Sequence, residues 1–437
     1  MRELKGDWRD LFNGFMVALD LRKCFLALLG IFVTICLCGG LTITLGNKLD
    51  PKAVEPPHDL VLHKWWRAQT QSWHVIYKGS WEARTTAAGT IDIIERPTNP
   101  WIKIGYSTLF ILLFLAIWSY FGGAIARIAA FEIAKDGERI ETRKALQFSR
   151  KKFWSFFWAP LICVIGFFFF AMCNYAGGLV GKLLDYAFIG APLVALLLPL
   201  ALLSGFIMTL ICVGTLTGLP LFAPAVAAEG TDSFDAVSRG FSYVYSRPWH
   251  YLWYQFVSSV YGYVCIAFVI LFAIILCHLG ISAGAEGFEL CGAWVRKDAT
   301  EFKQVANHSW SRILSEEHQN GGSYGWDQLS IARAPHPYGR LQALANGIVN
   351  VDYTSAGVTG PGPQIASFIV TLWLAITLGL SLGYVVSFFL SQQTLIYYIL
   401  RKKVDGIEMN EVFEEAEPAE EPQPTAPVAP IAEPPKS

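Results

Sequence analysis

The chain has 437 residues, of which 53% are hydrophobic and only 16% are charged, and its formal net charge is −1. A soluble protein of this length would form two or three domains, but several apolar runs here reach the roughly 20 residues needed to cross a bilayer. A net charge near zero excludes the basic field that nucleic-acid binding requires. The sequence therefore predicts an all-α integral membrane protein with the lipid bilayer, and no nucleic acid, as a partner.

The N-terminal third predicts two spans. Residues 1–23 have mixed charge and predict a cytoplasmic interfacial helix. The apolar run 24–46 is too long for a signal-peptide core and lacks a small-residue cleavage site, so we expect it to be retained as span 1. Residues 47–103 form an extracytoplasmic loop, and 104–127 form span 2.

The loop 47–103 has two open interpretations. The stretches "SWHVIYKGSW" and "GTIDII" have strand character, which predicts a small ordered extracytoplasmic cap. Alternatively, its tryptophans lie at the outer membrane interface. These tryptophans are Trp65, Trp66, Trp73, Trp81 and Trp101.

The middle of the chain predicts three further spans. They cover 154–176, 187–213 and 251–278, and the cytoplasmic connections are an interfacial helix at 128–153 and an interfacial segment at 214–250. The run 186–228 is long for one crossing and short for two. We favour one span with a kink at Pro192 and Pro199, followed by a stretch broken at Pro220 and Pro224.

The C-terminal third predicts a long loop, a sixth span and a tail. The extracytoplasmic loop covers 279–363 and contains an amphipathic helix at about 299–317. Span 6 covers 365–390, and the acidic, proline-rich tail within 404–437 cannot bury a core and is expected to be disordered. Loop 279–363 and the tail are the surfaces on which we expect protein partners.

Basic residues set the expected orientation. They are concentrated before span 1, between spans 2 and 3, and in Arg401–Lys403 after span 6. Basic flanks stay on the cytoplasmic side, so an even number of spans places both termini in the cytoplasm of a bacterial cytoplasmic-type membrane.

Three similar entries and exits predict an internal repeat. "DLRKCFLAL", "FSRKKFWSF" and "YSRPWHYLW" each place an arginine at the start of a span, and these arginines are candidates for contact with lipid headgroups. They are Arg22, Arg150 and Arg247. Ordinary membrane anchoring is favoured over lipid-specific binding. The exits each carry an acidic residue before a glycine that can end a helix in the left-handed conformation. These pairs are Asp136–Gly137, Glu229–Gly230 and Asp405–Gly406. We therefore predict three parallel repeats, each an interfacial helix followed by a two-span hairpin.

Small residues spaced by four predict close helix packing within the exit spans. The pairs are Gly122 with Ala126, Gly214 with Gly218, and Gly379 with Gly383. The central parts of the six predicted spans contain no charged residue, which disfavours an ion-coupled transporter.

Signals for chemistry are weak. The "GGSYG" stretch around Ser323 matches G-x-S-x-G, but no strand precedes it and no helix follows, so a turn is the better interpretation. His318 beside Glu316 and Glu317 is a weak metal candidate, with solvated side chains the favoured alternative. No cofactor, metal or catalytic residue is assigned.

The entries "ALQFSRKKFW" and "DAVSRGFSYVYSRPWHYLWY" and the exit "LIYYILRKKVDG" resemble those of uncharacterised bacterial six-span membrane proteins. They are also similar to the membrane domain fused to some glycerophosphodiester phosphodiesterases. The resemblance implies interfacial helices before spans; it transfers no catalytic residue, because the phosphodiesterase domain is not present in this sequence. We expect a non-enzymatic membrane protein that organises or assists a membrane process. The alternative is a passive conduit or lipid-handling protein with a groove between repeats.

Overall fold

A computed structural model describes residues 5–41, 81–85, 91–95, 100–184, 190–295 and 361–414, together with 302, 304–306 and 309. The described part is almost entirely helical, apart from one two-stranded ribbon. The elements in chain order are η1 (Trp8–Asn13), α1 (Gly14–Ala18), α2 (Leu21–Leu41), β1 (Trp81–Thr85), β2 (Ile91–Glu95), α5 (Pro100–Ala134), α6 (Thr142–Lys151), α7 (Phe153–Leu184), α8 (Gly190–Leu196), α9 (Leu198–Glu229), α10 (Ser233–Ser246), α11 (Pro248–Val295) and α14 (Pro361–Asp405).

Six of the described helices are long and apolar enough to cross a membrane, which confirms the predicted membrane class. The crossing segments are Leu21–Leu41, Ile104–Ala134, Phe153–Leu183, Leu198–Glu229, Pro248–Gly284 and Pro361–Asp405. Most extend beyond the predicted spans. The helix expected to end at residue 127 continues to Ala134, because the alanine- and isoleucine-rich sequence after that residue is buried.

The segment 214–250 differs from its predicted form. Residues 214–229 belong to α9, with Pro220 and Pro224 inside the helix, and the break falls earlier, at Leu197 before Pro199. Interior prolines in membrane helices are tolerated where neighbouring groups satisfy the loosened backbone. Here the Tyr251 hydroxyl donates to the carbonyl of Thr217, one turn before Pro220. The run 186–228 therefore provides one candidate span, and the amphipathic helix of this segment is α10 alone.

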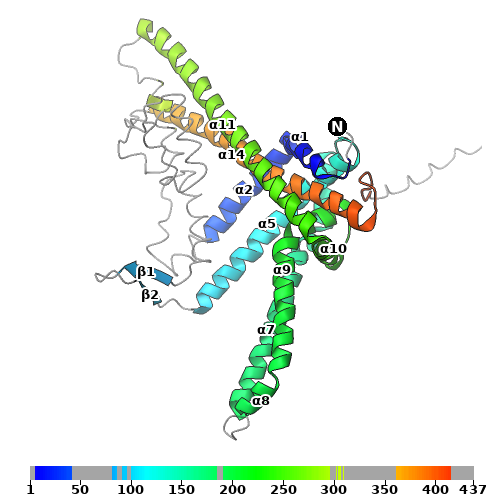
Figure 1. Ribbon diagram of the computed structural model, residues 1–437. Coiled ribbons are helices and arrows are strands. Elements are labelled where there is room, and N and C mark those ends of the chain that lie inside the picture. Colours follow the sequence, from blue (N-terminus) through cyan, green and yellow to red (C-terminus); the bar gives the residue numbers. More distant parts are fainter. Residues whose placement is uncertain are drawn as a thin grey trace, which may run out of the picture.

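The crossing helices pair into three hairpins, which Figure 1 shows diverging from one end of the molecule. The pairs are α2 with α5, α7 with α9, and α11 with α14, and α14 of the third hairpin also packs on α2 of the first. A short helix precedes each hairpin: η1 with α1, then α6, then α10. The three exits end at glycines with positive φ, namely Gly137 (90°), Gly230 (64°) and Gly406 (72°), as the acidic–glycine pattern predicts.

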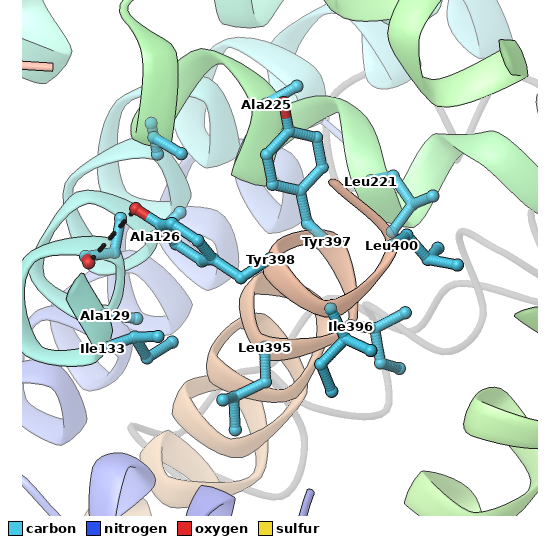
Figure 2. Close-up of a cluster of buried hydrophobic side chains, with 14 of the residues drawn as sticks. Ala126, Ala129, Ile133, Leu221, Ala225, Leu395, Ile396, Tyr397, Tyr398 and Leu400 are labelled. Atoms are coloured by element: carbon cyan, nitrogen blue, oxygen red, sulfur yellow. Dashed lines mark hydrogen bonds between the residues drawn. The ribbon is translucent and has the colours of Figure 1, made fainter. Parts of the chain in front are cut away.

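A buried cluster fills the end where the hairpins meet. α14 contributes a continuous run, Leu395–Leu400, which packs between the last turns of α5 and α9. Figure 2 shows Tyr398 beside Ala126 and Ala129 of α5, and Tyr397 between Ala225 and Leu221 of α9. The alanines leave room for the two tyrosine rings. The large side chains of α14 therefore pack against the small side chains of α5 and α9 and hold the three helices together.

Two further features belong to the long segments between crossing helices. β1 and β2 pair antiparallel, with Trp81 opposite Glu95 and Thr85 opposite Ile91. Residues 302, 304–306 and 309 are helical, within the predicted amphipathic helix 299–317. Val305 is buried, and the Ser309 hydroxyl lies 3.0 Å from the Ser367 carbonyl oxygen, so these residues pack against the start of α14.

Candidate functional site

The most unusual feature of the molecule is a set of charged side chains, four of them buried and one partly buried, where the hairpins meet. We call it the polar hub, and it consists of Lys23, Arg127, Glu132, Glu229 and Arg401. Lys23 is 0% exposed, and both Arg127 and Arg401 are 2% exposed. Because an isolated buried charge is costly, each of these groups requires partners within the protein.

Lys23 and Glu132 form a direct ion pair across the first hairpin. Lys23 Nζ donates to Glu132 Oε2 at 2.7 Å. Lys23 lies in the first turn of α2, where the positive end of the helix dipole disfavours a cation. Glu132 lies in the last turn of α5, where the negative end disfavours an anion. The antiparallel pairing of the two helices places the two charges together, and each charge offsets the penalty of the other.

Arg127 joins four parts of the chain. Its guanidinium lies between the rings of Phe131 and Phe148, at 4.5 and 4.1 Å from the ring centroids. It donates to the Ala227 carbonyl oxygen at 2.6 Å and to the carbonyl oxygen of Phe413. Arg127 therefore connects α5, α6, the end of α9 and the segment after α14.

The segment 406–414, which we call the C-terminal strap, lies across the hub. Arg401 donates to the carbonyl oxygens of Glu408 at 2.9 Å and Glu411 at 2.7 Å. The Phe413 amide donates to the Ala228 carbonyl oxygen at 2.8 Å. The last carbonyls of a helix have no partner within the helix. Arg127 and Phe413 satisfy two of them in α9, so the strap completes the end of that helix.

Glu229 ends α9 and contacts three side chains. Tyr397 donates to it at 2.5 Å, Arg239 pairs with it at 2.5 Å, and Arg401 lies 3.7 Å away. Burial alone would lower the pKa of Arg239, but its hydrogen bond to Asp235 and the Glu229 charge raise that pKa above its ordinary value. The Arg239 charge is therefore held fixed in this network.

A second link joins α10 to α14. The Tyr243 hydroxyl donates to Asp405 at 2.5 Å. Burial and this hydrogen bond raise the pKa of Tyr243 well above its usual range, so the phenol stays protonated. Asp405, the predicted acidic residue of the third exit, is thus part of the joint between a short helix and a span.

A belt of polar side chains continues along α14. Gln393 exchanges hydrogen bonds of 2.7 and 3.0 Å with Gln255 of α11. Gln392 donates to the Leu11 carbonyl oxygen at 2.8 Å, and Ser387 donates to that of Ala18 at 2.8 Å. These bonds attach α11 and the N-terminal helices to α14.

The small residues predicted for packing lie in different settings. A Cβ at Gly383 would overlap the Cys24 carbonyl of α2, so the backbones of α14 and α2 touch there. Gly218 lies against Gly240 of α10, and a Cβ at Gly214 would meet the Phe241 ring, so this pair serves a short helix rather than another span. Ala126 is fully buried in the hub cluster, whereas Gly122 has only ordinary contacts and Gly379 faces the Leu28 side chain.

The predicted headgroup arginines also differ from one another. Arg22 donates to Asp20 at 2.6 Å and to the Ile140 carbonyl oxygen at 2.7 Å, so it is held by protein groups. Arg150 and Arg247 are exposed at the entries to α7 and α11. Their contact with headgroups stays a prediction. The loop candidates Ser323, His318, Glu316 and Glu317 lie outside the described residues.

The arrangement joins the crossing helices to one another and to the segment after α14. Its charges are paired with fixed partners: a lysine with a carboxylate, and arginines with main-chain carbonyls. Among the described residues, no three His, Cys, Asp or Glu side chains come together as a metal site would require. Sequence reasoning missed the hub because it placed Glu132 in a surface connection; the signal was that Arg127 and Glu132 stand alone in an alanine- and isoleucine-rich stretch.

The chain matches no family model, no curated protein and no solved structure. The resemblance to the membrane domain of glycerophosphodiester phosphodiesterases therefore rests on the quoted entry and exit residues alone, and any role it implies for this chain is a proposal.

Proposed function

We propose that this chain is a non-enzymatic membrane protein that organises other membrane components, built from three parallel repeats with both termini in the cytoplasm. The hub holds the repeats together at the cytoplasmic face. The α7–α9 hairpin extends away from it and contacts transmembrane helices of a partner protein. One observation carries this proposal: only 6% of the most apolar window of α9 is buried.

The isolation of that hairpin supports a partner role. Close to the hub it packs on α5 and α10, through the cluster around Cys163, Phe222 and Phe241. Further out, both helices expose large apolar side chains on several faces, among them Phe168, Phe169, Leu202, Leu203 and Phe206. The hairpin stands apart from the other two in Figure 1.

A polar pair in the same hairpin points to a protein rather than only lipid as the neighbour. The Ser204 hydroxyl donates to Asn174 Oδ1 at 2.7 Å; Asn174 is exposed and Ser204 is half-buried between apolar helices. The Asn174 amide nitrogen has a sulfur neighbour, Met208 Sδ, at 3.9 Å. Amide groups in lipid gain roughly 0.6–2 kcal/mol from hydrogen bonds across helices, so Asn174 favours a helix with a polar side chain.

Site-specific photo-crosslinking tests the proposal in cells. A benzoyl-phenylalanine at Phe168 or Leu203 is expected to give a discrete protein adduct that weakens severalfold with Asn174→Leu. The same probe at the buried position Leu221 is the matched control and should give none. Adducts with lipid alone would contradict the proposal, and an adduct of twice the chain mass would identify the partner as a second copy.

A lipid-handling protein is the second candidate, because the hairpins diverge away from the hub. Purified protein in vesicles would then accelerate the transbilayer exchange of a fluorescent phospholipid. Crosslinking to protein without any such acceleration favours the organising role.

A further inference from the structure

The short helix α6 presents a strongly basic face with no assigned role. With its C-cap it carries five basic side chains and no acidic one: Arg143, Lys144, Arg150, Lys151 and Lys152. All are exposed except Lys152, which is half-buried. The opposite face, formed by Ala145, Phe148 and Ser149, is buried.

The orientation of this helix is fixed by its buried face. The Ser149 hydroxyl donates to the Tyr120 carbonyl oxygen of α5 at 2.6 Å. The Phe148 ring lies between the Arg127 guanidinium and the Phe156 ring of α7. The helix cannot rotate its basic face inward without breaking both contacts, so these contacts keep the basic side chains on the side of α6 that faces away from α5.

The basic face lies at the start of a membrane helix. Lys152 is followed at once by α7, whose first turns expose Trp154 (63%) and Trp158 (41%). Tryptophan prefers the headgroup region of a bilayer. Arg150, Lys151 and Lys152 are therefore at the depth where lipid phosphates lie.

The other two short helices lack this feature. α10 contains one arginine and one aspartate, which pair with each other at 3.0 Å. η1 contains Arg9 beside the buried Asp10, which accepts main-chain N–H groups of residues 5–7. Of the three elements that precede the hairpins, α6 is the one with an excess of positive charge.

Among the described residues, the acidic residues closest to α6 in the chain precede its N-terminal end. Asp136, Glu138 and Glu141 are in the turn before it, and Glu414 of the strap pairs with Lys135 at 2.7 Å. The acidic tail thus leaves the strap beside the end of α5. The C-terminal half of α6, next to α7, lies about ten residues or 15 Å of helix further along.

We propose that the exposed face of α6 binds the phosphate headgroups of anionic phospholipids, with Arg150, Lys151 and Lys152 as the principal contacts and Trp154 beside them at the interface. Juxtamembrane lysine and arginine side chains near an anionic surface each strengthen binding by roughly fivefold. The face thereby recruits anionic lipid to the second hairpin, independently of any protein partner.

The test is lipid titration of the full-length protein in neutral detergent, followed by native mass spectrometry. Phosphatidylglycerol should bind at least tenfold more tightly than phosphatidylcholine. The triple variant Arg150→Gln, Lys151→Gln, Lys152→Gln should lose that preference, with roughly a hundredfold weaker binding if the three contributions add. Unchanged preference in the triple variant would overturn the proposal.

A charge-matched control removes three basic residues at the same end of the molecule but away from α6: Lys5→Gln, Arg9→Gln and Lys402→Gln. It should change phosphatidylglycerol binding by less than threefold; an equal loss would show a diffuse charge effect and count against α6. Both triple variants must retain the wild-type gel-filtration profile. If either triple variant aggregates, single variants give the same comparison. Arg150→Gln should weaken phosphatidylglycerol binding about fivefold, and Arg9→Gln should leave it unchanged.

Two further arms separate the possible occupants. Inorganic phosphate at millimolar concentration should not displace phosphatidylglycerol, and full displacement would make the site one for free anions. A chain ending at Glu414 lacks most of the acidic tail. If that chain binds phosphatidylglycerol and the full-length chain does not, the tail occupies the face and the lipid proposal fails.

Discussion

In the most apolar windows of α2 and α5, 44% of the residues are buried, whereas in α9 the share is 6%. The windows have similar mean hydropathy, 2.5, 2.1 and 2.1, so apolar character does not explain the difference. In lipid, apolar surface provides little drive for helices to associate, and cohesion comes from polar bonds and from small residues that allow close approach. The first hairpin has both kinds of contact at the hub, while the outer half of the α7–α9 hairpin has the Asn174–Ser204 pair.

The largest effect is expected at the ion pair of the hub. Glu132→Gln leaves the fully buried Lys23 without its counter-charge and should destabilise the protein by about 3–5 kcal/mol. Lys23→Met combined with Glu132→Leu removes both charges and should recover most of that loss. Thermal unfolding in detergent, followed by tryptophan fluorescence, measures both.

An additive double variant would contradict this expectation, since it would mean that the two groups contribute independently. In the outer hairpin, Leu203→Ala removes an exposed side chain and should change the free energy of unfolding by less than about 0.5 kcal/mol. The contrast between the two regions would then follow directly from their burial.

The next effect concerns the C-terminal strap. Arg127→Lys keeps the charge but cannot reproduce the two guanidinium contacts to the Ala227 and Phe413 carbonyls, and it should cost about 1.5–3 kcal/mol. The strap should also become cleavable between Glu408 and Glu414 by a glutamate-specific protease.

The control for the strap is Lys402→Gln, which removes the partly exposed pair between Lys402 and Glu408. Exposed pairs contribute about 0–1 kcal/mol, so the strap should stay protected. Equal cleavage in both variants would show that Arg127 does not hold it.

A glycine comparison sharpens the contrast between packed and free helices. A Cβ at Gly383 would meet main-chain atoms of Cys24 and Leu28, which cannot move aside, so Gly383→Ala should cost about 1–3 kcal/mol. Gly205 of α9 has no neighbouring atom within 4 Å of such a Cβ, so Gly205→Ala should be neutral or stabilise by up to about 1 kcal/mol. The free energy of unfolding of both variants, measured in the same detergent, tests this difference. Equal effects would contradict the close contact of α14 with α2.

The sequence predicted the six helices because length and apolar character are local properties. It also predicted the helix ends at Gly137, Gly230 and Gly406, because the positive φ that ends each helix favours glycine, and glycine can be recognised in the sequence. The hub could not be predicted, because the partners are far apart in the chain: Lys23 and Glu132 are separated by 109 residues, and Arg127 and Phe413 by 286. The continuation of α9 through two prolines was likewise not predicted, because local sequence does not show contacts from other helices, such as the hydrogen bond from Tyr251 to the Thr217 carbonyl oxygen near Pro220.

The smallest predicted effect is a pH dependence at the entry to the first hairpin. Burial opposes the ionisation of Asp20, but hydrogen bonds from Arg22 outweigh it and hold the pKa of Asp20 below its ordinary value of 3.8. A lowered folded-state pKa stabilises the protein above the unfolded pKa, and this contribution disappears as the pH falls through the folded-state pKa. Asp20→Asn keeps an acceptor for the Arg22 amide and removes the charge.

This variant should cost roughly 0.5–1 kcal/mol at neutral pH, and progressively less as the pH falls below the unfolded-state pKa of Asp20. Thermal unfolding of both chains across that pH range measures the difference. A cost that does not change with pH would assign the effect to the lost hydrogen bonds with Arg22 rather than to the charge. The outer part of the α7–α9 hairpin offers no comparable comparison, because residues 153–184 and 198–228 contain no acidic residue and Glu229, at the end of α9, belongs to the hub.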